Sequence, residues 1–263
     1  MGGLPRTIGI GVFLVVLLHR ESSVKAQEDV TEATTDPIAT RNLFRVQPSY
    51  QNIDAGGNST SVLLRTTLWY RSFLIPGVPA PADWYSLFRI DIPLQSLNSS
   101  TAQDAGLQDI NVIDLVGRPW ASITVDGGIG ITIPTATHDS LGQGKLQLAP
   151  VLAAMVTGVP HARLGFLAQN YFSVAGDSDR PDLDYLSFQP LLSYYVSESW
   201  FLVSDATLSF DWKHGGDATL PIDLLVGHSF SSRLAMSLGP LWVTSGSGKN
   251  NVTTILRIDY ANW

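Results

Sequence analysis

The chain has 263 residues, of which 44% are apolar and 15% are charged, and it contains no cysteine. This composition excludes intrinsic disorder, and the lack of cysteine excludes disulfide-linked and cysteine-metal scaffolds. The formal net charge is −7. An acidic chain repels a phosphate backbone, so nucleic acid is not an expected partner. Because β-barrels often use about 200–250 residues in a single domain, we expect one folded domain.

The first 26 residues resemble a secretory signal peptide. Arg6 precedes an apolar run of 11 residues from Ile8 to Leu18, and the small residue Ala26 fits cleavage before Gln27. The run is too short to span a membrane as a helix, which needs about 20 residues, although an uncleaved anchor is the alternative. Without residues 1–26 the chain would keep 13 basic and 22 acidic residues, a net charge of −9.

Residues 27–40 are rich in Glu, Asp, Thr and Ala and have no apolar period. We expect this segment to be a flexible amino terminus without a role in the fold.

Residues 41–263 show apolar and polar residues in alternation, interrupted by clusters of Gly, Pro, Asn, Asp and Ser. A period of two residues is typical of β-strands with one apolar face. The clearest examples are 119–133 and 199–212, where the two faces separate almost completely. In all, the pattern predicts 12 strands, at about 41–50, 61–73, 84–93, 107–116, 119–133, 145–157, 161–173, 184–196, 199–212, 219–230, 232–244 and 251–263.

Two all-β folds fit this pattern, a soluble sandwich and a transmembrane barrel with an apolar outer face and a polar lumen. Connection lengths favour the barrel, because tight links at 158–160, 197–198 and 231 alternate with long ones at 134–144, 174–183, 213–218 and 245–250. Outer-membrane barrels alternate in this way between periplasmic turns and extracellular loops. Earlier in the chain, 51–60 and 94–106 are expected to be long loops and Gly117-Arg118 a short turn, whereas 74–83 is long for a turn.

Aromatic residues support the same choice. All seven tryptophans fall near predicted strand ends, where membrane proteins carry aromatic girdles. Four prolines, Pro150, Pro190, Pro221 and Pro240, fall inside predicted strands, where they would mark bulges or strand ends. The sequence therefore predicts an antiparallel transmembrane β-barrel of about 12 strands over 41–263, with short periplasmic turns and longer extracellular loops.

Two segments and two residue pairs resemble a known family. They are Ile133-Pro-Thr-Ala-Thr-His-Asp-Ser-Leu-Gly-Gln-Gly-Lys145, Gln169-Asn-Tyr-Phe-Ser-Val-Ala-Gly-Asp-Ser-Asp-Arg-Pro-Asp182, and the pairs Gln189-Pro190 and Asp211-Trp212. Together they resemble the outer-membrane family named after the meta-pathway of phenol degradation, mainly over residues 127–221. The resemblance implies a transporter or channel for small, often hydrophobic or aromatic compounds. It implies no catalytic residue.

Charged residues at two places are the candidate functional residues. Those in the inward register would line the lumen: Arg65, Arg89, Asp91, Asp126, Arg163, Asp205, Asp223, Arg233, Arg257 and Asp259. Those in the two family-like loops would shape the extracellular mouth: Asp139, Lys145, Asp177, Asp179, Arg180 and Asp182. The lumenal charges either form an electrostatic constriction or fill the barrel by pairing, and the loop charges form an entry site or simply order the loops.

The expected function is an outer-membrane channel or transporter for small molecules. Two alternatives stay open, an outer-membrane enzyme acting on envelope lipids and a structural barrel with a filled lumen. His138, Asp139 and Ser140 are neighbours in sequence only, and no nucleophile elbow or dinucleotide fingerprint occurs. We therefore expect no enzyme, no cofactor and no metal, since Asp177, Asp179 and Asp182 lack the spacing of a calcium loop. The expected partners are outer-membrane lipid, a small solute and the outer-membrane assembly machinery.

Overall fold

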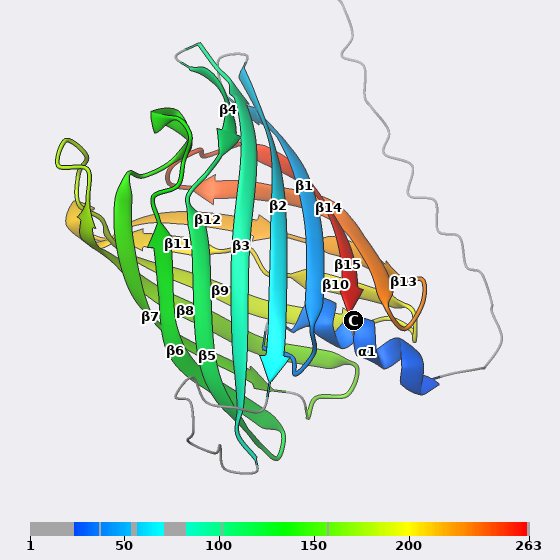
Figure 1. Ribbon diagram of the computed structural model, residues 1–263. Helices are drawn as coiled ribbons and strands as arrows, with labels where there is room; N and C mark the ends of the chain where they lie inside the picture. Colours follow the sequence, from blue (N-terminus) through cyan, green and yellow to red (C-terminus); the bar gives the residue numbers. More distant parts are fainter. Residues whose placement is uncertain are drawn as a thin grey trace, which may run out of the picture.

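The strands of the protein form one antiparallel sheet that closes on itself (Figure 1). The computed structural model describes residues 24–36, 38–53, 57–70, 83–100, 102–156 and 158–261. Within these residues the first strand pairs with the last, which closes the barrel. The strands are β1 (Leu43–Ile53), β2 (Gly57–Tyr70), β3 (Tyr85–Asn98), β4 (Gln103–Leu107), β5 (Ile110–Trp120), β6 (Ile123–Ile133), β7 (Lys145–Val156), β8 (Ala162–Gly176), β9 (Asp184–Tyr195), β10 (Trp200–Ser204), β11 (Leu208–Asp211), β12 (Asp217–Asp223), β13 (Leu225–Ser229), β14 (Leu234–Ser245) and β15 (Val252–Ala261).

These elements make twelve barrel strands, as the sequence predicts. The short β4 only extends the hairpin of β3, while β10 and β11 are two halves of one interrupted strand, and β12 and β13 are two halves of the next. Antiparallel register runs unbroken around most of the wall, from β15 through β1, β2, β3, β5, β6 and β7. The predicted fold class is therefore confirmed.

Three predicted connections differ from the structure. The expected loop at 51–60 is mostly strand, because β1 and β2 pair up to Ile53 and Gly57. The expected loop at 94–106 contains the end of β3 and all of β4. The turn predicted at Gly117-Arg118 lies instead at Ala121-Ser122, where Ala121 adopts φ 51°, whereas Gly117 stays paired with Asp126 and leaves room for its carboxylate. The predicted long turn at 74–83 lies almost wholly outside the described residues.

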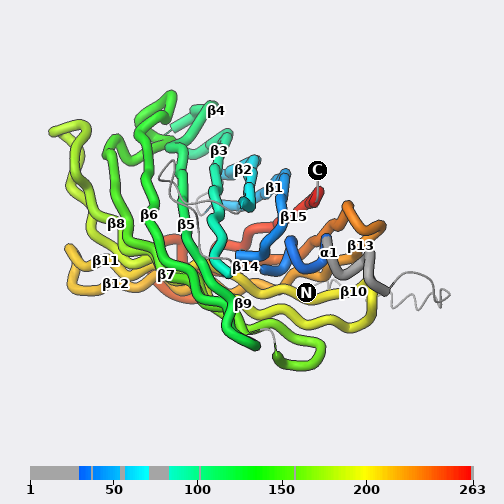
Figure 2. The backbone as a smooth tube through the Cα atoms, turned by 60° about the horizontal axis from the view of Figure 1, so that its bottom comes forward, coloured from blue at the N-terminus to red at the C-terminus, as the bar shows by residue number. Residues whose placement is uncertain are grey.

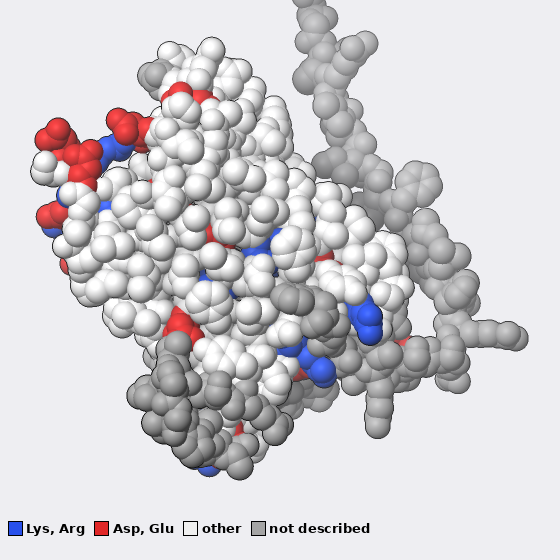
Figure 3. All heavy atoms as spheres, in the orientation of Figure 1, with Lys and Arg blue, Asp and Glu red and all other residues white. Residues whose placement is uncertain are grey.

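Apolar side chains cover the outer surface of the barrel. We call the end where β1 begins and β15 stops the terminal end, and the opposite end the loop end. Trp120 and Trp200 lie at the terminal end and Trp212 and Trp242 at the loop end, each about half exposed. Figure 3 shows acidic side chains gathered on loops at the loop end. The positions of the four tryptophans match the aromatic girdles expected from the sequence.

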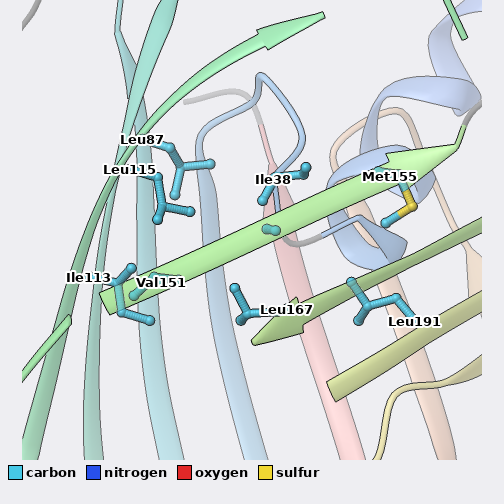
Figure 4. Packing of buried hydrophobic residues seen from close by; sticks show 9 residues of the cluster. Ile38, Leu87, Ile113, Leu115, Val151, Met155, Leu167 and Leu191 are labelled. Carbon is cyan, nitrogen blue, oxygen red and sulfur yellow. The ribbon is translucent and has the colours of Figure 1, made fainter. Parts of the chain in front are cut away.

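The lumen is not polar throughout, in contrast to the expectation. A buried apolar cluster of inward side chains fills one side of it (Figure 4), made by Ile38, Leu87, Ile113, Leu115, Val151, Ala153, Met155, Leu167 and Leu191. Strands such as β7 carry apolar residues on both faces, so alternation does not reveal which of their residues point inward. Burying these side chains packs β3, β5, β7, β8 and β9 against the segment that contains Ile38.

Helix α1 (Val24–Thr35) lies inside the terminal end of the barrel. Figure 2, which brings this end forward, shows it beside β10 and β13. Val30 and Ala33 are buried against Phe201, Val203 and Ala235. Residues 27–40 were expected to be flexible, so this docked helix is a correction, and its cause is tertiary packing that local composition does not reveal. Of the predicted signal peptide, residues 1–26, the first 23 residues lie outside the described residues. No helix in the described ranges is long and apolar enough to cross a membrane.

Candidate solute pathway in the lumen

Four charged side chains form a row across neighbouring strands in the lumen. The register pairs Asp259 of β15 with Arg45 of β1, Arg45 with Arg65 of β2, and Arg65 with Asp91 of β3. Directly paired residues on one face of a sheet lie about 5 Å apart, so their side chains interact. The same alternation that builds the strands therefore builds this row.

Each arginine in the row binds one aspartate with two nitrogens. Arg45 Nε and Nη2 donate to the two carboxylate oxygens of Asp259 at 2.6 and 3.2 Å. Arg65 Nε and Nη2 donate to Asp91 at 2.7 and 2.8 Å. Bidentate pairs of this kind fix the orientation of both side chains. These charged side chains are therefore fixed in position and do not move freely in the lumen.

A third pair joins strands that are not neighbours. Arg257 of β15 donates from Nη1 and Nη2 to Asp205 at 2.8 and 2.7 Å, and its Nε donates to Gln47 at 2.9 Å. Asp205 belongs to the interruption between β10 and β11. The pair therefore bridges part of the lumen and narrows it.

The interruption at residues 205–207 turns the chain toward the lumen. Asp205, Ala206 and Thr207 all line the same cavity, so the alternation of an ordinary strand is lost. Pro190 of β9 and Pro221 of β12, two of the prolines noted in the sequence, belong to the flanking strands and offer no N–H to a ladder. Instead, Asp223 accepts hydrogen bonds from the amides of Asp205 at 2.8 Å and Ala206 at 3.0 Å.

The charged residues line two cavities. The larger, of about 240 Å³, has polar walls from Arg45, Arg65, Asp205, Asp223 and Arg257 and apolar walls that include Leu63, Leu241 and Ile255. The smaller, of about 20 Å³, lies between α1 and the side chains of Arg45, Arg65 and Arg89. Arg45, Arg65, Gln189 and Asp205 line both, so the cavities adjoin.

Polar contacts hold α1 and the residues after it against the wall. Arg163 of β8 contacts Glu32 at 3.1 Å and Asp36 at 3.3 Å. Thr31 and Ser229 hydroxyls lie 2.5 Å apart, and Arg45 Nη2 donates to the carbonyl of Thr34 at 2.9 Å. Burial raises the pKa of the Asp36 carboxyl to about 6, against the opposing effects of the Ile38 amide and Arg163. The helix is therefore docked by contacts that can be exchanged for water.

The predicted mouth residues meet in pairs between two loops. Arg180 Nη2 donates to the carbonyl of Asp139 at 2.7 Å, and Lys145 Nζ lies 3.0 Å from Asp182. The hydrogen bond and charge of Lys145 lower the pKa of Asp182. Asp177 accepts from the amide of Asp179 at 2.9 Å, which is a turn contact. Among the described residues no group of three acidic or histidine side chains is arranged to hold a metal.

Most predicted lumenal residues lie inside the barrel, and one does not. Arg65, Arg89, Asp205, Asp223 and Arg257 line the cavities. Asp91 pairs with Arg65, Asp259 pairs with Arg45, and Arg163 binds the docked segment. Asp126 is fully buried beside Tyr85, whose hydroxyl donates to it at 2.7 Å. Arg233 is exposed in the turn before β14, which corrects its assignment to the lumen. The sequence analysis does not include Arg45, although Arg45 shares the inward face of β1 with Leu43 and Gln47.

The histidine and serine neighbourhood at the loop end does not form a catalytic triad. Ser140 donates to one oxygen of Asp104 at 2.5 Å, and His138 Nδ1 lies 3.7 Å from the other oxygen. The carboxylate therefore stands between the two side chains, whereas a triad requires the imidazole in that position.

Comparisons with known proteins show the fold. No family model and no curated protein matches the sequence. Among solved structures, the chain is similar to an outer-membrane channel from Pseudomonas putida F1, with a TM-score of 0.65, 11% identity and coverage of 85% of this chain and 96% of that one. It is also similar to outer-membrane phospholipase A from Escherichia coli, with a TM-score of 0.50, 10% identity and coverage of 89% and 97%. At such identities a likeness shows fold alone, and the fold of this chain is that of an outer-membrane β-barrel.

Proposed function

We propose that this chain is a passive channel of the bacterial outer membrane that passes small solutes, hydrophobic or aromatic ones included. The observation that carries the proposal is the cavity of about 240 Å³ inside a closed barrel, lined both by ion-paired and by apolar side chains. Such a wall wets the lumen and still accepts apolar groups. Outer-membrane lipid and the assembly machinery of that membrane are the partners that this location requires.

The paired state of the lumenal charges supports passage. Arg45, Arg65 and Arg257 are each neutralised by an aspartate at 2.6–2.7 Å, so a neutral solute meets hydrogen-bonding groups without a strong field of one sign. A barrel of twelve strands is wider than the small barrels filled by side chains and narrower than the porins. This width fits a narrow route for small molecules. The proposal includes no catalytic step.

Solute flux tests the proposal. The refolded chain in liposomes should permit swelling in small neutral solutes. Asp205→Asn, which releases Arg257 from its bridge, should change the swelling rate at least twofold. Arg233→Gln is the matched control because Arg233 is exposed in a turn, and it should leave the rate unchanged. A folded barrel that admits no solute, or equal effects of the two variants, would contradict the proposal.

A structural barrel with a filled lumen is the second candidate, because α1 and the apolar cluster occupy part of the lumen. This candidate predicts no flux in the intact chain and none after removal of residues 27–36. A channel instead predicts faster flux once the helix is gone. The deletion therefore separates the two functions.

A further inference from the structure

Arg89 of β3 is the lumenal arginine whose charge is not matched by a carboxylate of its own. Its Nη2 lies 3.4 Å from Asp91, but both oxygens of Asp91 already accept from Arg65 at 2.7 and 2.8 Å. Arg89 is only 7% exposed, and its Nε has no hydrogen-bond partner among the described residues. A buried guanidinium with an unused donor is costly unless an anion or water completes it.

The unmatched donor belongs to a side chain that lines the smaller cavity. Arg45, Arg65 and Arg89 converge on this space of about 20 Å³. The space therefore accepts a small polar group. Arg45 and Arg65 are already paired with Asp259 and Asp91. The aspartates that line this space, Asp205 and Asp36, are paired with Arg257 and Arg163. Arg89 therefore leaves the space with a net positive charge that favours an anion.

The larger cavity continues from this position toward apolar walls. Its volume of about 240 Å³ gives room for several waters or for an apolar group of similar size. Leu63, Leu241 and Ile255 form walls that cannot replace the hydrogen bonds of water. An apolar ligand group that enters this space displaces poorly bound water, and this displacement favours binding.

We propose that the lumen binds a small amphipathic carboxylate, with its carboxylate at Arg89, Arg65 and Arg45 and its apolar body against Leu63, Leu241 and Ile255. The inference rests on the proposed channel function and names the class of solute that dwells in it. A carboxylate accepts two parallel hydrogen bonds from a guanidinium, and Arg89 is the guanidinium in this lining that has no carboxylate of its own. The ligand would act as the missing acidic partner of Arg89.

Asp223 is the feature that opposes this assignment. It also lines the larger cavity, and one of its oxygens has no hydrogen-bond partner among the described residues. Its other oxygen, however, already accepts from two amides and from the Ser204 hydroxyl at 3.2 Å. A cationic ligand recognised by Asp223 is therefore the outcome that would overturn the proposal.

Calorimetric titration of the refolded chain in detergent tests the site with three probes of equal length, hexanoate, hexan-1-ol and hexylamine. Hexanoate should bind at least tenfold more tightly than the other two. Arg89→Gln should lower the affinity for hexanoate at least tenfold and leave the affinity for hexan-1-ol unchanged. The hexanoate affinity of Arg89→Lys should lie between those of the unchanged chain and Arg89→Gln. Arg118→Gln is the control, because Arg118 is 41% exposed and pairs with Asp83 outside the cavities.

The outcomes separate this inference from the channel function. Equal binding of hexan-1-ol, tighter binding of hexylamine, or full hexanoate affinity in Arg89→Gln would overturn the carboxylate site, whether or not the barrel conducts. Hexanoate binding to a barrel that passes no solute would keep the site and contradict the channel. Folding of each variant is checked by heat-dependent mobility on gels, and Arg89→Lys keeps the test decisive if Arg89→Gln fails to fold.

Discussion

Arg45 and Asp259 illustrate how charges are kept inside this barrel. Their side chains are 5% and 0% exposed and bind each other through two hydrogen bonds. Removing two charges from water is expensive, and close geometry with additional hydrogen bonds offsets the cost. Arg45 also donates to the carbonyl of Thr34, so one side chain links the wall to the docked segment.

Arg45→Met should destabilise the folded barrel by roughly 3–5 kcal/mol, because it leaves Asp259 buried without its cation. The double variant Arg45→Met/Asp259→Leu should recover most of this loss, since no lone charge remains. Urea unfolding in detergent, followed by the heat-dependent gel shift, measures both. A double variant no more stable than the single one would show that the cost does not come from the unpaired carboxylate.

The sequence reveals these residues only where a strand has one clearly polar face. Arg65, Asp91 and Asp259 stand in alternation with apolar neighbours, so their inward direction follows from the period of two. Arg233 is an exception, because the predicted strand at 232–244 begins two residues before β14, which starts at Leu234. Ser231 accepts from the amides of Arg233 and Leu234, which holds these residues in a turn. Short turn contacts of this kind shift a strand boundary by two residues.

At the scale of elements, α1 is the feature that the sequence could not predict. Its segment is polar and lacks an apolar period, which is typical of a flexible terminus. The helix gains its partners only from strands far away in sequence, through Arg163, Ser229 and the pocket around Phe201. A helix of 12 residues is marginal alone, so these contacts decide whether it forms.

A disulfide should lock α1 in its docked position. The chain has no cysteine, and the hydroxyls of Thr31 and Ser229 lie 2.5 Å apart, close enough for a Thr31→Cys/Ser229→Cys bond. Under oxidation, conductance should fall at least twofold below that of the reduced protein, because the helix can no longer leave the lumen. Each single cysteine variant is the control and should show no redox effect. Conductance unaffected by oxidation would show that α1 does not limit passage.

Docking of α1 should weaken as pH rises. The pKa of Asp36 is about 6 when docked, against 3.8 ordinarily, because burial disfavours its charged form more than the Ile38 amide and Arg163 favour it. The negative charge of Glu32 nearby raises the pKa further. The docked state therefore binds the proton more tightly, and docking is strongest below about pH 4 and weakest above about pH 6. Two pKa units correspond to at most about 3 kcal/mol.

Protease accessibility of residues 27–40 between pH 4 and 7 measures this dependence. Accessibility should increase through about pH 5–6 in the intact chain and should be nearly constant in Asp36→Asn, which stays neutral. Tighter docking at higher pH would show that the ion pair with Arg163 outweighs burial.

At the scale of the whole molecule, the lumen has an apolar side and a charged side. One side is packed with Leu, Ile, Val and Met, and the other carries the ion pairs and both cavities. The number of strands followed from turn spacing and alternation, which are local properties. The division did not, because strands such as β7 are apolar on both faces and only closure decides which face is inside.

Single-channel recording in a planar bilayer tests the central claim most directly, namely that solutes cross the barrel along its charged lumen. The refolded chain should give defined conductance steps, and Asp205→Asn should change their size while Arg233→Gln should not. A barrel that is folded by its gel mobility and inserted, yet silent at every voltage before and after removal of residues 27–36, would contradict the account and leave a structural barrel with a filled lumen.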